Sequence, residues 1–205
     1  MTPQAALDRG LGELQLALGP EARERLLDYM ALLVKWNRTY NLTAIRDPLA
    51  MVAHHLLDSL AVAPHLPLGA GGRLADAGSG AGLPGIPLAI ARPDWHVALA
   101  EANQKKAAFL RQAAIELHLR NVEVHEGRVE TWRPQPLFDA VISRAFAALA
   151  DFIAACRHLL APAGVLVAMA GAAPAKLQGD CKLIPLQVPQ LDAQRHLVLC
   201  PASSL

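Results

Sequence analysis

The sequence has few of the features that mark secreted proteins stabilised by disulfide bonds or proteins with structural metal sites. It contains three cysteines in 205 residues, Cys156, Cys181 and Cys200, and none of them forms a CxxC pair. We therefore expect neither a zinc site nor a disulfide framework, and we interpret Cys156 and Cys200 as core or surface thiols.

Long apolar runs and a leader pattern are also lacking. No uninterrupted apolar stretch reaches the roughly 18 residues needed to span a bilayer. The opening residues, MTPQAALDRG, lack the basic-then-apolar pattern of a signal peptide. We expect a cytoplasmic monomer with no membrane partner.

Charge is sparse and nearly balanced. Charged residues make up 18% of the chain and the formal net charge is +1. A chain that is 53% hydrophobic can bury a sizeable core, so disorder is excluded. The neutral total neither requires nor excludes a nucleic-acid partner, since a basic face can sit inside it.

The hydrophobic pattern of the sequence divides the chain into two parts. Residues 1–66 look helical: Leu26, Met30 and Leu33 fall at helical spacing after a start at Pro20, and a second helix is predicted over 48–62. The stretch PHLPLGAGG then breaks the pattern. We predict an N-terminal helical cap over 1–66 and a second domain over 70–205, joined in one integrated structural unit.

After Gly72, short apolar runs alternate with helical segments, which predicts an α/β fold with a mostly parallel sheet. Helices are expected from about 84, over 105–118 and over 151–160. The last two strands are expected to form a closing antiparallel pair. The seven strand candidates are 73–77, 96–101, 122–127, 138–143, 164–170, 183–188 and 195–200.

The first strand runs into LADAGSGAGLPGIPL, a loop dense in glycine. Glycines there let backbone N–H groups approach a ligand beyond the strand ends. Asp76 would crowd a pyrophosphate, whereas an acidic residue followed by Gly78-x-Gly80-x-Gly82 suits a ligand with a cationic amino-acid end. S-adenosylmethionine has that chemistry. The GxGxxG of Gly80, Gly82 and Gly85 is a weak signal for a dinucleotide.

Later strand ends carry further candidates. Glu101 ends the second strand, where a carboxylate can accept ribose hydroxyls of either S-adenosylmethionine or a nicotinamide dinucleotide. Arg128, Val129 and Glu130 follow the third strand, beside the expected adenine. Arg144, in SRAF after the fourth strand, lies where a substrate is expected; as a strand-end residue it should contribute little to stability.

The fourth strand end excludes some chemistries. It carries no cysteine for covalent attack on a pyrimidine ring and no Asn/Asp-Pro-Pro-aromatic run suited to exocyclic amines. The N7 lone pair of guanine fits what remains. That nucleophile needs no general base, so proximity and orientation would carry most of the catalysis.

Together, several motifs resemble the bacterial glucose-inhibited division protein B family of small-subunit ribosomal RNA guanine-N7 methyltransferases. They cover about residues 26–198 and are KWNRTYNLTAIRDP, HHLLDSL, DAGSGAGLPGIPLAIARPD, FLRQ, FDAVISRAF and LQVPQLDAQRHLV. The resemblance implies a class I S-adenosylmethionine-dependent methyltransferase fold, Rossmann-like, with a helical cap.

The resemblance also implies site residues. Cofactor contacts fall on Gly78, Leu83, Val129, Glu130 and Arg144, with Asp76, Gly80 and Glu101 in the same pocket. RNA-facing basic residues fall on Arg128, Arg144 and Arg195, and the implied partner is 16S ribosomal RNA or the small ribosomal subunit.

Three positions depart from the family's usual pattern. Glu101-Ala102 stands where Asp-Ser is usual, and Gln104 where a glycine is usual. Ala170-Gly171 stands where Lys-Gly is usual after the fifth strand. The last change removes a positive charge near the expected active-site rim and bears on rate or RNA affinity.

Two further clusters allow more than one interpretation. In KWNRTYNLT, Lys35 and Arg38 suit an RNA surface, or they stay solvated while Trp36 and Tyr40 pack the cap onto the main domain. His54 and Asp58 share a helix face, but zinc needs a third ligand and none is evident, so no metal is expected. Asp58 with Ser59 would instead hold the cap against the glycine loop.

The function favoured is methyl transfer from S-adenosylmethionine to N7 of a guanine in 16S ribosomal RNA, with Arg144 as the catalytic residue. One alternative is a non-catalytic RNA-binding or assembly module. Another is a nicotinamide-dependent oxidoreductase, which the absence of a His or Tyr-Lys arrangement near the strand ends disfavours.

Overall fold

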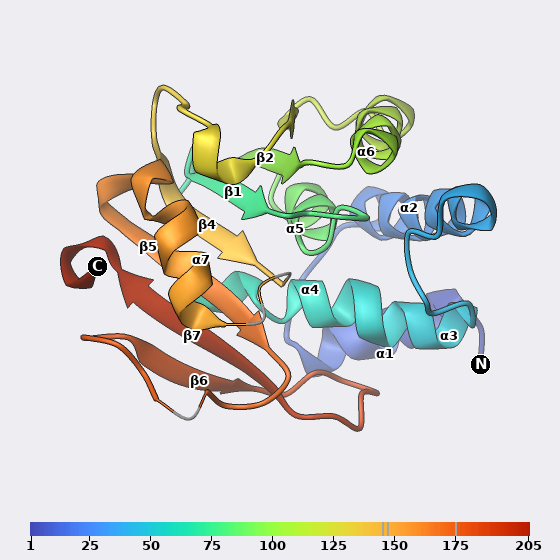
Figure 1. The fold of residues 1–205 in the computed structure, drawn as a ribbon. Helices are drawn as coiled ribbons and strands as arrows, with labels where there is room; N and C mark the ends of the chain where they lie inside the picture. The colour runs from blue at the N-terminus through green and yellow to red at the C-terminus, as the bar shows by residue number, and fades with distance from the viewer. Residues whose placement is uncertain (145, 147, 175) are drawn as a thin grey trace.

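A seven-stranded sheet forms the centre of the protein (Figure 1). The computed structural model describes residues 1–144, 146, 148–174 and 176–205. The strand order is β3-β2-β1-β4-β5-β7-β6; β1 to β5 pair in parallel, and β7 runs antiparallel to both of its neighbours. The predicted fold class and the closing antiparallel pair are confirmed. The strands are β1 (Arg73–Ala77), β2 (His96–Glu101), β3 (Val122–Glu126), β4 (Phe138–Ser143), β5 (Leu160–Ala170), β6 (Lys182–Leu186) and β7 (Arg195–Pro201).

Helices cover both faces of this sheet because successive strand residues point to opposite sides. In β1, Leu74 belongs to one buried cluster, while Ala75 and Ala77 belong to another. The first cluster lies under α5 (Gly85–Ala91), α6 (Gln104–Glu116) and the N-terminal helices, and the second under α7 (Leu149–Cys156). The core of the N-terminal helices is therefore continuous with that of the sheet.

The N-terminal helices are α1 (Pro3–Glu13) and α2 (Pro20–Tyr40), followed by a second helical stretch. Pro20 suits the first position of α2, and Asn41, with φ of 49°, ends it in the left-handed region. The helix predicted over 48–62 is not regular. It begins as α3 (Pro48–Met51), passes through a π-helical segment (Val52–Leu57) and ends as α4 (Asp58–Leu60). Such π segments are frequent at functional sites.

The strand order reverses between β1 and β4, since β1 connects on one side to β2 and β4 on the other to β5. In open parallel sheets a ligand crevice lies beyond the carboxyl ends of the strands at this reversal. The glycine loop follows β1 and Arg144 follows β4, so both meet at this edge.

One prediction about the cysteines is wrong. Cys181 and Cys200 form a disulfide, with their Cα atoms 4.2 Å apart, while Cys156 is buried and unpaired. The two cysteines are distant in sequence, but the β6–β7 pairing places Lys182 opposite Leu199 and so brings their neighbours face to face. The strand register could not be read from the cysteine spacing. No helix in the described ranges is both long and apolar enough to cross a bilayer.

Candidate active site

The glycine loop after β1 is held in a conformation that side chains disfavour. Gly78, Gly80 and Gly82 have φ values of 70°, 57° and 87°, in the left-handed region that glycine adopts without strain. The backbone N–H groups of Gly78 and Ser79 both donate to the carbonyl of Ala100, at 2.9 and 3.0 Å. The loop is thereby fixed against the end of β2.

Tyr29 ties the helical cap to this loop. Its buried hydroxyl donates to the carbonyl of Ala81 at 2.7 Å, and burial raises the pKa of the phenol. The prediction that Asp58 and Ser59 hold the cap against the loop is wrong. The Ser59 hydroxyl instead donates to the carbonyl of His55 within its own helix. A tyrosine at a core position of α2 gave no sequence signal for this contact.

Asp76 lies wholly buried beneath the loop. Its Oδ2 accepts the N–H of Gly85 at 2.8 Å, while its Oδ1 has no partner among the described residues. Burial raises the pKa of this carboxyl to about 7, opposed by the Gly85 N–H and by the charge of Arg144. An unpartnered carboxylate oxygen at this point suits a cationic group of a ligand.

Glu101 closes the other side of the loop. Its Oε2 accepts the N–H of Gly80 at 2.8 Å and its Oε1 accepts the N–H of Asn103 at 2.7 Å. The longer glutamate side chain thus turns back onto the loop. Each oxygen keeps a second lone pair, so the carboxylate can still accept hydroxyl donors such as those of a ribose.

Glu101 lines a cavity of about 250 Å³, which we name the glycine-loop cavity. A Cβ on Gly80, beside it, would meet only the carbonyl oxygen of Gly78, at 3.9 Å, so this side of the loop is open. The cavity brings together four of the predicted cofactor residues with Arg128, whose guanidinium is 3.4 Å from the Glu130 carboxylate. Its lining is Gly78, Ala100, Glu101, Ala102, Gly127, Arg128, Val129, Glu130 and Phe146.

Four predicted cofactor residues are not part of the lining of the glycine-loop cavity: Asp76, Gly80, Leu83 and Arg144. Asp76 lies beneath the loop and Gly80 within it. Leu83 is buried in the main core, so its assignment stays a prediction. Arg144 lines a second cavity. Phe146 belongs to SRAF, the segment expected to face a substrate, and was not predicted as a cofactor residue; it lines the glycine-loop cavity. Ala145, part of the same motif, lies outside the described residues.

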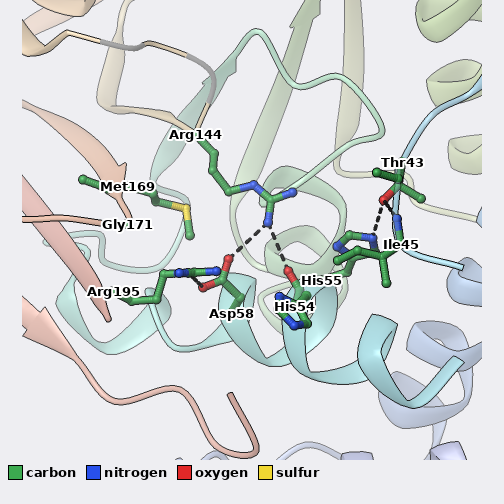
Figure 2. Close-up of a pocket in the computed structure, with 11 residues that line it drawn as sticks. Thr43, Ile45, His54, His55, Asp58, Arg144, Met169, Gly171 and Arg195 are labelled. Atoms are coloured by element: carbon green, nitrogen blue, oxygen red, sulfur yellow. Dashed lines mark hydrogen bonds and ion pairs between the residues drawn. The ribbon is translucent and has the colours of Figure 1, made fainter. Parts of the chain in front are cut away.

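The second cavity, about 440 Å³, lies between the cap and the ends of β4 and β5 (Figure 2). We name it the arginine cavity, because Arg144 and Arg195 both reach it. Ala170 also lines it, so the departure from the family's usual lysine falls within this site. Its lining is Thr43, Ala44, Ile45, His54, His55, Asp58, Arg144, Met169, Ala170, Gly171 and Arg195.

Asp58 connects the two arginines. Nη1 of Arg144 donates to Asp58 Oδ2 at 3.1 Å and to the carbonyl of His54 at 3.1 Å, while Nε of Arg195 donates to Asp58 Oδ1 at 3.0 Å. The Asp58 side chain is 1% exposed. Figure 2 shows the three side chains converging from the cap and from the strand ends.

The motif KWNRTYNLT contributes Thr43 to the cap wall of the arginine cavity. The Asn37 side chain exchanges two 2.9 Å hydrogen bonds with the backbone of Thr43. The Thr43 hydroxyl in turn lies 2.9 Å from Nε2 of His55. Burial lowers the pKa of His55 to about 4, so the ring is neutral at pH 7. Within the described ranges, no three His, Cys, Asp or Glu side chains are grouped closely enough to hold a metal.

Lys35 and Arg38 lie on the exposed face of α2 and line neither cavity. Trp36 between them packs on Phe109 of α6, with ring centroids 5.6 Å apart. The packing interpretation is confirmed for Trp36 but is wrong for Tyr40, which is exposed and contacts Trp36 of its own helix. The RNA role of the two cations stays a prediction.

Comparison with known proteins agrees with this arrangement. Residues 22–197 match the family described as GidB, rRNA small subunit methyltransferase G. A ribosomal RNA small subunit methyltransferase G of Methylobacillus flagellatus is 52% identical over 204 residues, covering 97% of this chain and 98% of that protein. One of Chromobacterium violaceum is 52% identical over 202 residues and covers 95% of each chain.

Solved structures show the same fold at low identity. A tRNA (m1A58) methyltransferase of Aquifex aeolicus superposes with a TM-score of 0.56 at 15% identity, covering 71% of this chain and 68% of that one. TYW2 of M. jannaschii, in complex with AdoMet, gives a TM-score of 0.52 at 14% identity, covering 69% and 73%. The oxidoreductase alternative is set aside because the matched family is one of methyltransferases. As the sequence motifs predicted, the chain belongs to the rRNA small subunit methyltransferase G family.

Proposed function

We propose that this protein transfers the methyl group of S-adenosylmethionine to N7 of a guanine in 16S ribosomal RNA of the small subunit. One observation carries the proposal: the short segment after β4 lines both cavities. Phe146 contributes to the glycine-loop cavity and Arg144 to the arginine cavity. A methyl donor in the first and a nucleotide in the second would meet at this segment, at the strand-order reversal.

The glycine-loop residues would hold the cofactor. The unpartnered oxygen of Asp76 would accept the ammonium, Glu101 the ribose hydroxyls, and Val129 with Glu130 would border the adenine. Gly78 and Gly80 leave room for the ligand. Two observations support this fit: the buried Oδ1 of Asp76 has no hydrogen-bond partner among the described residues, and the space beside Gly80 is open.

When bound, S-adenosylmethionine supplies an electrophilic methyl group on a sulfonium. The protein's task is then to orient the base, because the N7 lone pair needs no proton removed. His55 is neutral and bonded to Thr43, in keeping with a wall residue rather than a general base. Arg144 would donate to guanine O6 or a neighbouring phosphate, since a donor on N7 would block the attacking lone pair.

RNA contacts would extend from the arginine cavity outward. Arg195 within the cavity, Arg128 at the rim of the glycine-loop cavity, and Lys35 with Arg38 on the cap supply positive charge for phosphates. A cap of residues 1–66 and a methyltransferase domain of 70–205 would act as one monomeric unit, with cations from both parts available to the RNA. A cytoplasmic location suits a ribosomal substrate.

The test is methyl transfer from labelled S-adenosylmethionine to unmodified 16S ribosomal RNA, offered as free RNA and as assembled small subunits. N7-methylguanine is mapped by strand cleavage after borohydride and aniline. We expect label at one guanine with one of the two substrates. Label on another base would contradict the guanine-N7 assignment, and RNA binding without any transfer would favour the assembly-module alternative.

A further inference from the structure

Asp58 is a buried carboxylate that binds two cations and leaves little surface for a ligand. Its side chain is 1% exposed, against 33% for Arg144 and 23% for Arg195. Burying a carboxylate is costly, and pairing it with cations offsets that cost. Both oxygens are used, one for each arginine, so Asp58 acts on the cavity through the guanidinium groups.

The three residues come from separate parts of the chain. Asp58 begins α4 in the cap, Arg144 follows β4, and Arg195 begins β7. One carboxylate therefore sets the relative position of two guanidinium groups at the same cavity (Figure 2). The contacts of Arg144 in the described part of the chain use Nη1, and its remaining donors can serve a substrate.

Resting on the function proposed above, we propose that Asp58 is a positioning residue that also offsets positive charge at the reacting base. In the transfer, guanine N7 bonds the methyl carbon and the carbon–sulfur electron pair passes to sulfur. One positive charge thereby moves from sulfur to the imidazole ring of guanine. Two guanidinium groups beside that ring oppose this charge, and the Asp58 carboxylate balances one of them.

The same charges act differently on RNA binding. Phosphates are attracted by guanidinium groups, and a neighbouring carboxylate weakens that attraction. Removing the charge of Asp58 should therefore slow methyl transfer without weakening RNA binding. A residue that only stabilised the fold would, when lost, lower both together.

The experiment compares Asp58→Asn with Asp47→Ala. Asp47 caps the same helical stretch, its Oδ2 accepting the N–H of Ala50 at 2.7 Å, but it lines neither cavity. We expect Asp58→Asn to lower transfer at saturating RNA and cofactor by about tenfold or more. Its RNA Kd should equal or fall below that of the wild type. Asp47→Ala should lose thermal stability and keep its transfer rate.

A second variant separates the charge argument from an effect on folding. Adding Arg195→Ala to Asp58→Asn restores the cavity's original net charge, so transfer at saturating RNA should recover in part. A normal rate for Asp58→Asn, a parallel loss of transfer and RNA affinity, or no recovery in the double variant would overturn the proposal. If the wild type itself transfers no methyl group, the proposed function fails instead.

Discussion

Replacing Arg144 with alanine tests the core of the proposed site. The substitution removes the guanidinium that bonds Asp58 and the carbonyl of His54. A sequence-based view of Arg144 as a strand-end residue predicts an almost unchanged melting temperature. The structure revises that view, because the partner is a carboxylate that is 1% exposed.

The loss of stability can be bounded from these contacts. A hydrogen bond to a charged group contributes about 1.5–3 kcal/mol when buried. Arg144 is 33% exposed and Asp58 keeps its bond to Arg195, so the lower end applies. We expect the free energy of unfolding to fall by about 1–2 kcal/mol, which for a chain of this size lowers Tm by roughly 2–8 °C.

The loss of activity should exceed what this destabilisation explains. We expect transfer to fall by about tenfold or more on saturating RNA and cofactor, equivalent to about 1.4 kcal/mol of transition-state stabilisation. Arg144→Lys should rescue poorly, because an ammonium cannot reproduce the planar fork. Single-turnover transfer at a temperature well below Tm is the assay.

Arg195→Ala is the matched control, since it removes the other cation from the same carboxylate. It should lower stability by a similar amount but act mainly on RNA affinity and its salt dependence. Near-normal transfer by Arg144→Ala would refute the catalytic role. Equal loss of the saturated rate in both variants would show that Arg144 has no distinct part in the reaction.

Four further outcomes are expected. Gly80→Val should abolish binding of S-adenosylmethionine in calorimetry while the far-ultraviolet circular dichroism spectrum persists, because φ at Gly80 is 57° and the added side chain would occupy the open space beside this residue. Unchanged affinity would contradict this. Affinity for the cofactor should fall as pH drops through about 7, because Asp76 then gains a proton and loses its attraction for an ammonium group. Asp76→Asn should make cofactor affinity nearly independent of pH in this range. The same variant should raise the free energy of unfolding of the ligand-free protein above pH 7, because a raised carboxyl pKa in the folded state means that ionisation of Asp76 destabilises the fold there. Tyr29→Phe should lower urea stability by about 1–3 kcal/mol by leaving the carbonyl of Ala81 unpaired, and a silent substitution would show that the contact is dispensable. Ala170→Lys should steepen the salt dependence of RNA binding by about one unit of log–log slope, and an unchanged slope would place RNA away from the arginine cavity.

The fold was predictable because its signals are local. The strands alternate with helical segments at spacings that read directly from the chain, and the glycine loop marks the first strand end. The register of β6 against β7 depends on contacts between separate segments and cannot be predicted from local sequence. The disulfide bond between Cys181 and Cys200 was missed for this reason. The π-helical segment was missed for a similar reason, since an apolar pattern does not distinguish it from a regular helix.

The candidate site was predictable where a single chemical group of the ligand is bound by a residue at the end of a strand. Gly78, Glu101, Val129 and Glu130 share a cavity because parallel strands present their carboxyl ends at one edge. The arginine cavity needs contacts across the chain, between the cap and strands more than 80 residues later. No spacing rule links Asp58 to Arg144, so sequence reasoning paired Asp58 with the nearer glycine loop.

The structure also explains how a single glutamate can replace a shorter carboxylate at Glu101. The extra methylene lets Oε2 reach the N–H of Gly80 and Oε1 the N–H of Asn103, so the carboxylate fixes the loop and the start of α6 together. A shorter side chain from the same strand end could not extend as far toward both groups. Glu101→Asp should therefore loosen the loop as well as shift the ribose contact, lowering cofactor affinity and raising amide hydrogen exchange at Gly80. If affinity fell with exchange at Gly80 unchanged, the glutamate would act on the ligand alone.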